Sequence, residues 1–210
     1  MRRTILTLSL LLVQAMLPVA SQAATYYVSP QGSDTAPCSA PAPCQTINAG
    51  IQRLQGGDTL VIGSGTYHET ILAIPSGTAG APTVIHAAPG ATVWLQPTSE
   101  VDCALHFGGS TRHVTIERIN IDTNHQGPFG VCTDPQTHHI ILRHFEIKNA
   151  TGSGGLTMGN YLEMRNLHIH HNGRDPLYDH GIYQQASNSI FDSNTIHDNQ
   201  GYRLHNYPQC

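Results

Sequence analysis

The 210 residues of the chain are enough for one domain with a buried core, but only 11% of them are charged and 6% are aromatic. This composition does not suit a helical bundle and favours many short strands joined by polar turns. The formal net charge of −4, with no basic cluster, argues against a nucleic-acid partner.

The chain opens with the pattern of a secretory signal peptide at residues 1–23. Arg2 and Arg3 give it a positive start, an apolar run follows over residues 5–19, and Ser21 and Ala23 are the small residues of a cleavage site. The apolar run is shorter than the roughly 20 residues that span a bilayer. We therefore expect a secreted or periplasmic protein with no membrane segment after cleavage.

Residues 24–100 are expected to form an N-terminal cap and the first coils of a stacked fold. The pattern predicts strands at 25–28 and 59–62, and a short helix at 46–54 whose apolar face carries Ile47, Ile51 and Leu54. A stack of strands leaves apolar core and unpaired backbone at its open end. A helix laid across that end covers both, so we predict that 46–54 is a cap.

Residues 101–210 repeat with one period. An Ile followed closely by Asn recurs at Ile121, Ile147, Ile169 and Ile196. A Gly-apolar pair recurs with the same period of about 25 residues, and such periods indicate stacked units that bury their apolar sides against each other. These pairs are Gly130–Val131, Gly155–Leu156 and Gly181–Ile182.

Within each repeat, apolar residues alternate with period two, shift by one, and alternate again. The sets are Val114, Ile116, Ile119 and Ile121; Ile140, Leu142, Phe145 and Ile147; and Leu162, Met164, Leu167 and Ile169. This pattern predicts a strand, a tight corner and a second strand, with both apolar faces inward. The Gly-apolar pairs predict a third strand, which completes a three-sided coil that rises by about 4.8 Å. Its expected inward residues are Leu105, Phe107, Val131, Thr133, Leu156, Met158, Ile182 and Gln184.

The five cysteines agree with export to an oxidising compartment. Cys38 and Cys44 bracket a short loop that a disulfide would close. Cys103 and Cys132 lie one predicted coil apart and are a second candidate pair, which leaves Cys210 over.

Several segments resemble secreted pectate-lyase-like β-helix proteins. TYYVSPQGSD, PCQTINAGIQRLQGGDTLVIGSGTYHE and GTAGAPTVIHAAPGATV resemble their opening, and DHGIYQQASNSIFDSNTIHDNQGY resembles a later coil. The resemblance covers nearly all of the mature chain. It implies an all-β fold, a right-handed parallel β-helix (a single-stranded solenoid with three strands per coil) with a short N-terminal capping helix. It also implies an extracellular acidic polysaccharide as partner.

In that superfamily the carbohydrate groove follows the Gly-apolar strands and the loops that precede them. When the repeats of the chain are aligned on their Gly-apolar pairs, the strand positions expected to face outward are His106, Cys132, Thr157, Tyr183 and His205. The loop over residues 170–180 holds the densest cluster of titratable groups, and loops on a rigid scaffold are common sites of function. The expected substrate-binding residues are His106, His170, His171, Arg174, Tyr178, Tyr183 and His205.

The resemblance also implies candidates for chemistry. The base in related lyases is often Lys or Arg, which singles out Lys148, the one lysine of the chain. Alternatively, Lys148 only pairs with Asp122 one coil below. Asp179 and His180 are the other catalytic candidates, because a carboxylate beside an imidazole orients a base or binds a cation; alternatively, Asp179 caps the turn. Asp175 and Asp179 are the candidate Ca²⁺ ligands.

The reaction stays open at this stage, because the superfamily contains lyases, glycoside hydrolases, uronan epimerases and members with no known activity. A polysaccharide (uronan) lyase acting by β-elimination is the favoured hypothesis. The alternatives are a non-catalytic glycan-binding or cell-surface protein, and a glycoside hydrolase or epimerase. The Asp134–Pro135 dipeptide matches epimerase sites but its flanks do not.

Two further features lead to predictions. Fourteen histidines, among them His138, His139 and His168, suggest a metal site. Their spacing follows the repeat, however, and favours equivalent positions on the surface of successive coils instead. The sequence also stops in mid-coil, so we expect further C-terminal coils or a partner that covers the open end.

Overall fold

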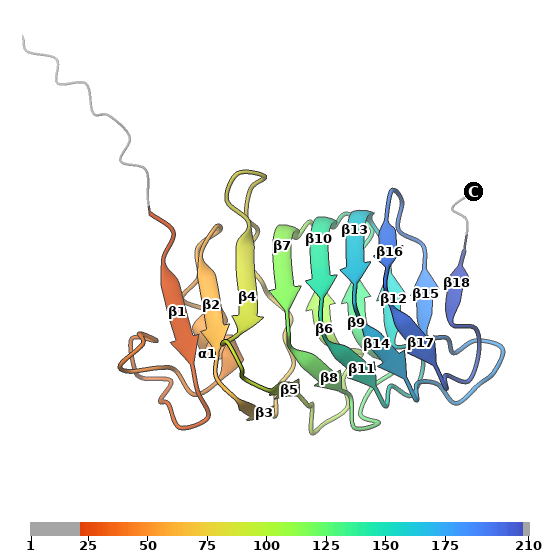
Figure 1. The fold of residues 1–210 in the computed structure, drawn as a ribbon, viewed down its shortest axis with the longest axis horizontal. Helices are drawn as coiled ribbons and strands as arrows, with labels where there is room; N and C mark the ends of the chain where they lie inside the picture. The colour runs from red at the N-terminus through yellow and green to blue at the C-terminus, as the bar shows by residue number, and fades with distance from the viewer. Residues whose placement is uncertain (1–21, 208–210) are drawn as a thin grey trace, which may run out of the picture.

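The computed structural model describes residues 22–207, and it is a nearly all-β solenoid of parallel strands (Figure 1). The chain winds through three sheets of seven, six and five strands. Each strand pairs with the strand one coil before and one coil after it, so the stack runs from β1 at one end to β18 at the other (Figure 1). Residues 1–21 of the predicted signal peptide and Cys210 lie outside the described residues.

The strands fall into three sheets, which we number 1 to 3. Sheet 1 contains β1 (Thr25–Val28), β2 (Thr59–Ile62), β4 (Thr83–Ala87), β7 (Arg112–Glu117), β10 (His138–Arg143), β13 (Asn160–Arg165) and β16 (Ile190–Asp192). Sheet 2 contains β3 (Gly65–Tyr67), β5 (Val93–Leu95), β8 (Asn120–Asp122), β11 (Glu146–Lys148), β14 (His168–His170) and β17 (Thr195–His197). Sheet 3 contains β6 (Cys103–Phe107), β9 (Phe129–Thr133), β12 (Gly155–Thr157), β15 (Ile182–Gln184) and β18 (Leu204–Asn206).

The isoleucine ladder lies inside the stack as predicted. Ile121, Ile147 and Ile169 are direct partners on neighbouring strands of sheet 2, and all three are fully buried. Ile196 continues the ladder. The column beginning at Val114 and Ile116 in sheet 1 is equally in register with the next two coils. The period of the sequence is therefore the length of one coil.

The third strand of one coil differs from the prediction by one residue. We expected Leu156 and Met158 to point inward, but Gly155 pairs with Val131 and Ile182, so Gly155 and Thr157 point inward and Leu156 faces outward. The sequence has two successive glycines here, Gly154 and Gly155, and the predicted Gly-apolar pair used the second of them, Gly155.

Close packing explains why the glycine marker has the same period as the isoleucine marker. A Cβ atom at Gly130 would lie 2.4 Å from Cγ2 of Ile147, and one at Gly181 would lie 2.4 Å from Cγ2 of Ile196. Such distances are far below van der Waals contact. The column of Gly130, Gly154 and Gly181 therefore gives room to the isoleucine of the next coil.

The N-terminal part contains the predicted helix in shorter form. Helix α1 covers Ile47–Ile51, and the Oγ1 atom of Thr46 accepts a hydrogen bond from the Ala49 N–H, as an N-cap does. Ile47, Ile51 and Leu54 are buried as expected. Among residues 22–207, no helix has the length and hydropathy of a membrane span.

Both candidate disulfides are present. Cys38 bonds to Cys44 within the N-terminal loop, and Cys103 bonds to Cys132 across two neighbouring coils of sheet 3. The first closes a separation of 6 residues and the second one of 29. Disulfides that close longer loops remove more entropy from the unfolded chain, so the bond between coils is expected to matter more.

We predict that the Cys103→Ala/Cys132→Ala double variant loses about 3.5 kcal/mol of unfolding free energy, from the loop-entropy relation. The Cys38→Ala/Cys44→Ala variant is the matched comparison, with an expected loss of about 2 kcal/mol on the same basis. Urea unfolding followed by circular dichroism measures both. The reverse order of effects would refute the idea that chain entropy dominates.

Candidate functional site

The outer face of sheet 3 carries one column of side chains from successive coils. His106, Cys132, Leu156, Tyr183 and His205 are register partners. Thr157, which we expected in this column, is instead fully buried, because the register is shifted at Gly155. Cys132 is buried in its disulfide, so the exposed functional groups of the column lie at its two ends.

At one end, His106 forms a pair with an aspartate of the next coil. Its Nε2 atom lies 2.8 Å from Oδ1 of Asp134, whose Oδ2 atom accepts a hydrogen bond from the Gly109 N–H. The hydrogen bond from His106 is the main reason that the pKa of Asp134 lies below its ordinary value. Both residues were noted from the sequence, but no local sequence pattern indicates that they pair, because they are 28 positions apart.

At the other end, His180 and His205 form a directly bonded imidazole pair. The Nε2 atom of His180 lies 2.6 Å from Nδ1 of His205, and the backbone N–H of Tyr202 donates to Nδ1 of His180 at 3.1 Å. An atom that accepts from a backbone N–H carries no proton, so neutral His180 is protonated on Nε2 and donates to His205. His205 then carries its own proton on Nε2.

Burial favours the neutral form of His180. His180 is 1% exposed, and burial, followed by the proximity of His205, lowers the pKa of His180. His205 is half-buried, and its Nε2 atom forms no hydrogen bond within residues 22–207. The pair therefore presents one N–H group that is available to a bound molecule.

Aromatic rings surround the pair. The ring of Tyr183 stacks on that of His180 with a centroid distance of 5.8 Å. The ring centroids of Tyr202 and Tyr207 lie 5.6 Å and 6.4 Å from that of His205. Tyr202 and Tyr207 are exposed. The repeat pattern does not identify them as site residues, because they follow the last complete repeat. Exposed aromatic faces beside polar groups suit the apolar faces of sugar rings.

The loop over residues 170–180 is shaped by its own carboxylates. Oδ2 of Asp179 accepts hydrogen bonds from the N–H groups of Arg174 and Asp175, both at 2.7 Å. Oδ1 of Asp175 accepts from the Leu177 N–H at 2.8 Å. Asp179 thus caps the turn. Tyr178 is 74% exposed at the tip of the loop.

A polar cavity of about 620 Å³ lies where the loops enter sheet 3. Its charged and titratable lining comes from Glu100, Asp102, His125 and Arg174. Within residues 22–207, Arg174 forms no ion pair, so its guanidinium is free for an acidic ligand. The two carboxylates were not identified from the sequence, because they precede the first regular repeat.

Lys148 lies on sheet 2 rather than in the sheet 3 column. It stands in register with Asp122, as predicted, but its ion pair is with Glu146 at 3.0 Å, and its ammonium lies 4.2 Å from the centre of the Trp94 ring. Burial raises the pKa of Glu146, but contacts from Lys148 and His170 outweigh burial, and the pKa falls below its ordinary value.

His170 and His171 also belong to sheet 2 and the turn after it. Nε2 of His170 lies 3.0 Å from Oε1 of Glu146, and its Nδ1 atom lies 2.6 Å from Nδ1 of His171. The structure therefore joins Lys148, His170 and His171 into one group on sheet 2. It joins His180, Tyr183 and His205 into another group on sheet 3.

The sequence matches a known family and named relatives. The family model described as the right-handed β-helix region matches residues 103–209. The chain is 40% identical over 146 residues to a protein named pectate lyase PEL9 from Emericella nidulans, an alignment that covers 60% of this chain and 34% of that protein. The chain thus spans about a third of the length of that relative.

Solved structures share the fold. A rhamnogalacturonan lyase superposes with a TM-score of 0.69 at 15% identity, covering 86% of this chain and 53% of the other. Pectate lyase Pel9A superposes with a TM-score of 0.67 at 19% identity, covering 88% of this chain and 50% of the other. At this identity, the superpositions establish the pectate-lyase-like right-handed β-helix fold.

Proposed function

Because the chain belongs to the right-handed β-helix family and has a pectate-lyase-like fold, we propose that it acts on an extracellular acidic polysaccharide by β-elimination along sheet 3. The 40% identity with a protein named as a pectate lyase is the observation that carries the reaction class. The Arg174 guanidinium, which forms no ion pair within residues 22–207 and lines the polar cavity, supports an acidic substrate.

The chemistry has three requirements, for two of which the chain offers candidates. A base removes the C5 proton of a uronate, a cation neutralises its carboxylate, and an acid protonates the leaving oxygen. We assign the cation to Arg174, whose planar fork fits a carboxylate. We assign the leaving oxygen to His205, whose Nε2–H, oriented through His180, donates a hydrogen bond to the developing negative charge while solvent supplies the proton. The family resemblance implies Lys148 as the base, but its strand and its ion pair with Glu146 hold it on sheet 2, so we assign no base on sheet 3.

Ca²⁺ remains part of the proposal at a modified position. Asp175 and Asp179 do not fit as a Ca²⁺ pair, because their oxygens already accept backbone N–H groups and Ca²⁺ takes about six to eight oxygen ligands. Glu100 and Asp102 in the polar cavity are the carboxylates that suit such an ion. No step above depends on it.

The proposal also places the protein outside the cytoplasm. Two disulfides support an oxidising compartment, and the signal-like pattern at residues 1–23 supports export. We likewise propose that α1 caps the first coil, since its apolar side packs on β1 and β2: a Cβ atom at Gly50 would lie 2.7 Å from Val28 and from Leu60.

A substrate panel tests the reaction class. We expect the mature protein, incubated with pectate, alginate or rhamnogalacturonan, to generate the ultraviolet absorbance of an unsaturated uronide from at least one of them. Parallel reactions with added calcium and with a chelator report any ion requirement. Reducing ends without that absorbance would indicate a hydrolase and contradict the proposal.

A glycan-binding protein without catalysis is the second candidate. The exposed rings of Tyr178, Tyr202 and Tyr207 favour it, because aromatic surfaces hold sugars whether or not a bond is cleaved. Retarded migration in a gel that contains the polysaccharide, with no product of either kind, would establish this function instead.

A further inference from the structure

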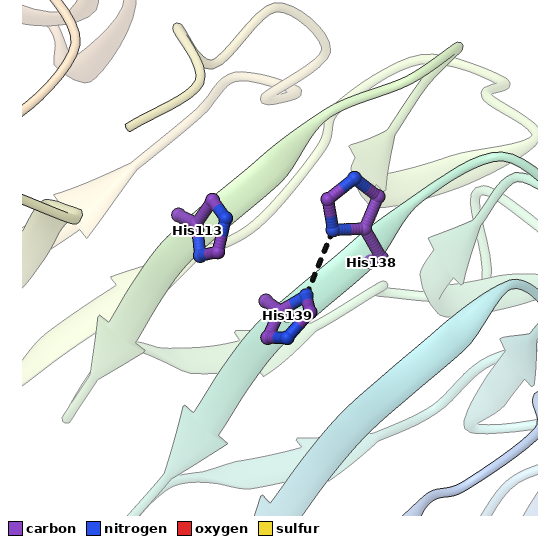
Figure 2. A group of neighbouring side chains, drawn as sticks. All are labelled: His113, His138 and His139. Atoms are coloured by element: carbon purple, nitrogen blue, oxygen red, sulfur yellow. Dashed lines mark hydrogen bonds between the residues drawn. The ribbon is translucent and has the colours of Figure 1, made fainter. Parts of the chain in front are cut away.

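Three histidines converge on the outer face of sheet 1, away from the sheet 3 groove. His113 comes from β7, and His138 and His139 come from β10, which is the next strand of the sheet (Figure 2). One nitrogen from each imidazole can be chosen so that all three lie within 4.8 Å of one another. The residues come from two coils, so the repeat itself brings them together.

An unusual backbone conformation places the rings on one side. Successive residues of a strand normally point to opposite faces, so His138 and His139 would be expected to diverge. His139 instead has φ of 56°, and His113, one coil earlier, has φ of 52°. This left-handed conformation is uncommon for residues other than Gly, Asn, Asp and His. It interrupts the alternation and directs both neighbouring imidazoles outward (Figure 2).

The same conformation recurs in the following coils with different side chains. In the next two coils, Tyr161 and Asn188 stand at the position equivalent to His139, and they have φ of 54° and 50°. The fold therefore tolerates several residues in this column, and histidine is not required there for the turn.

The geometry of the three rings suits a metal ion. The Nδ1 atoms of His138 and His139 lie 2.8 Å apart, so at most one of them is protonated and the other offers a lone pair. The ring centroids of His113 and His139 are 4.7 Å apart.

We propose that His113, His138 and His139 form a binding site for a divalent transition-metal ion, with Zn²⁺ as the expected occupant. Imidazole nitrogen is a preferred ligand of Zn²⁺, Cu²⁺ and Ni²⁺, and three histidines with one open position are a known zinc arrangement. A hollow of about 330 Å³, which His113, His139 and Tyr161 help to line, leaves room for the water or small ligand that would complete the coordination.

A second group of potential metal ligands could also bind Zn²⁺, so it determines which variant of the protein is used for the measurement. Glu146, His168 and His170 also place potential ligand atoms within 4.8 Å of one another on sheet 2. The experiment therefore uses the His168→Ala chain without any histidine tag. In that background, His113→Asn and His139→Asn each remove one ligand, and Asn188 shows that asparagine is compatible with the left-handed backbone. His68→Ala, at an exposed histidine outside both groups, is the matched control.

Zn²⁺ affinity is measured by competition with a chromogenic chelator, and Co²⁺ substitution reports the geometry by its visible spectrum. We expect one equivalent of Zn²⁺ in the background protein and in His68→Ala. We expect each asparagine variant to bind at least about 100-fold more weakly, beyond the roughly 10- to 100-fold cost of disturbing an outer-shell partner. Circular dichroism verifies that each variant is folded.

Two results would overturn the inference: no stoichiometric Zn²⁺ binding by the background protein, or equal affinity in the folded asparagine variants. Either result leaves the proposed polysaccharide chemistry untouched, because that chemistry is assayed on sheet 3 substrates.

Discussion

Replacing His205 with alanine is expected to lower the turnover number for the acidic polysaccharide by about 100- to 1,000-fold, the range typical of a lost hydrogen-bond donor to a developing oxyanion. The effect should fall on kcat more than on KM, because the Nε2–H group is needed when the leaving oxygen takes up charge. The initial rate of unsaturated product measures it. His68→Ala is the control and should retain full activity. Unchanged turnover in a folded His205→Ala protein would remove His205 from the mechanism.

His180 acts as a positioning residue, and its pH profile distinguishes that role from mere packing. Neutral His180 accepts the Tyr202 N–H on Nδ1, and protonation of Nδ1 would break this contact. Since the pKa of His180 lies below the ordinary 6.5, activity should persist below that pH and be lost as the pH falls through the lowered pKa. In His180→Gln, which has no imidazole to protonate, this acid limb should be absent. An unshifted limb would show that His180 only packs.

Replacing Asn172 with alanine is expected to cost about 4 kcal/mol of unfolding free energy, because several buried polar groups lose partners worth about 1–3 kcal/mol each. Asn172 is 1% exposed. Its Oδ1 atom accepts the Ala150 N–H at 2.9 Å, and its Nδ2 atom donates to the carbonyl of His170 and to Oδ1 of Asn199. The side chain therefore ties three successive coils together.

Urea unfolding followed by circular dichroism tests this expectation. Asn206→Ala is the control, because Asn206 is exposed on β18 and its loss should change the unfolding free energy by no more than about 0.5 kcal/mol. A loss below about 1 kcal/mol for Asn172→Ala would mean that water replaces these contacts and that the asparagine ladder does not stabilise the stack.

The stacked fold was predictable because its main constraint is local and repeated. Ile121, Ile147 and Ile169 recur with the length of one coil, and each must fill the same interior column. The register error at Leu156 arose where two glycines offered two equivalent alignments. Only the packing of Gly154 beneath Ile169 decides between them, and packing between coils leaves no mark on a single repeat.

The candidate site was predictable only in part. His180, Tyr183 and His205 were selected from the repeat and do come together. The pairing of His106 with Asp134 and the carboxylates Glu100 and Asp102 were not identified. Lys148 was expected in the groove, but its strand belongs to sheet 2. Such contacts depend on which sheet a strand joins and on side-chain direction, and periodicity specifies neither.

The most direct test of the account is the mass of the products formed from pectate in water enriched in the heavy oxygen isotope. Elimination breaks the bond without water, so we predict an unsaturated fragment and no heavy oxygen from solvent at the newly formed chain ends, with controls for slow exchange at reducing ends. Saturated products that carry heavy oxygen would show hydrolysis and contradict the account.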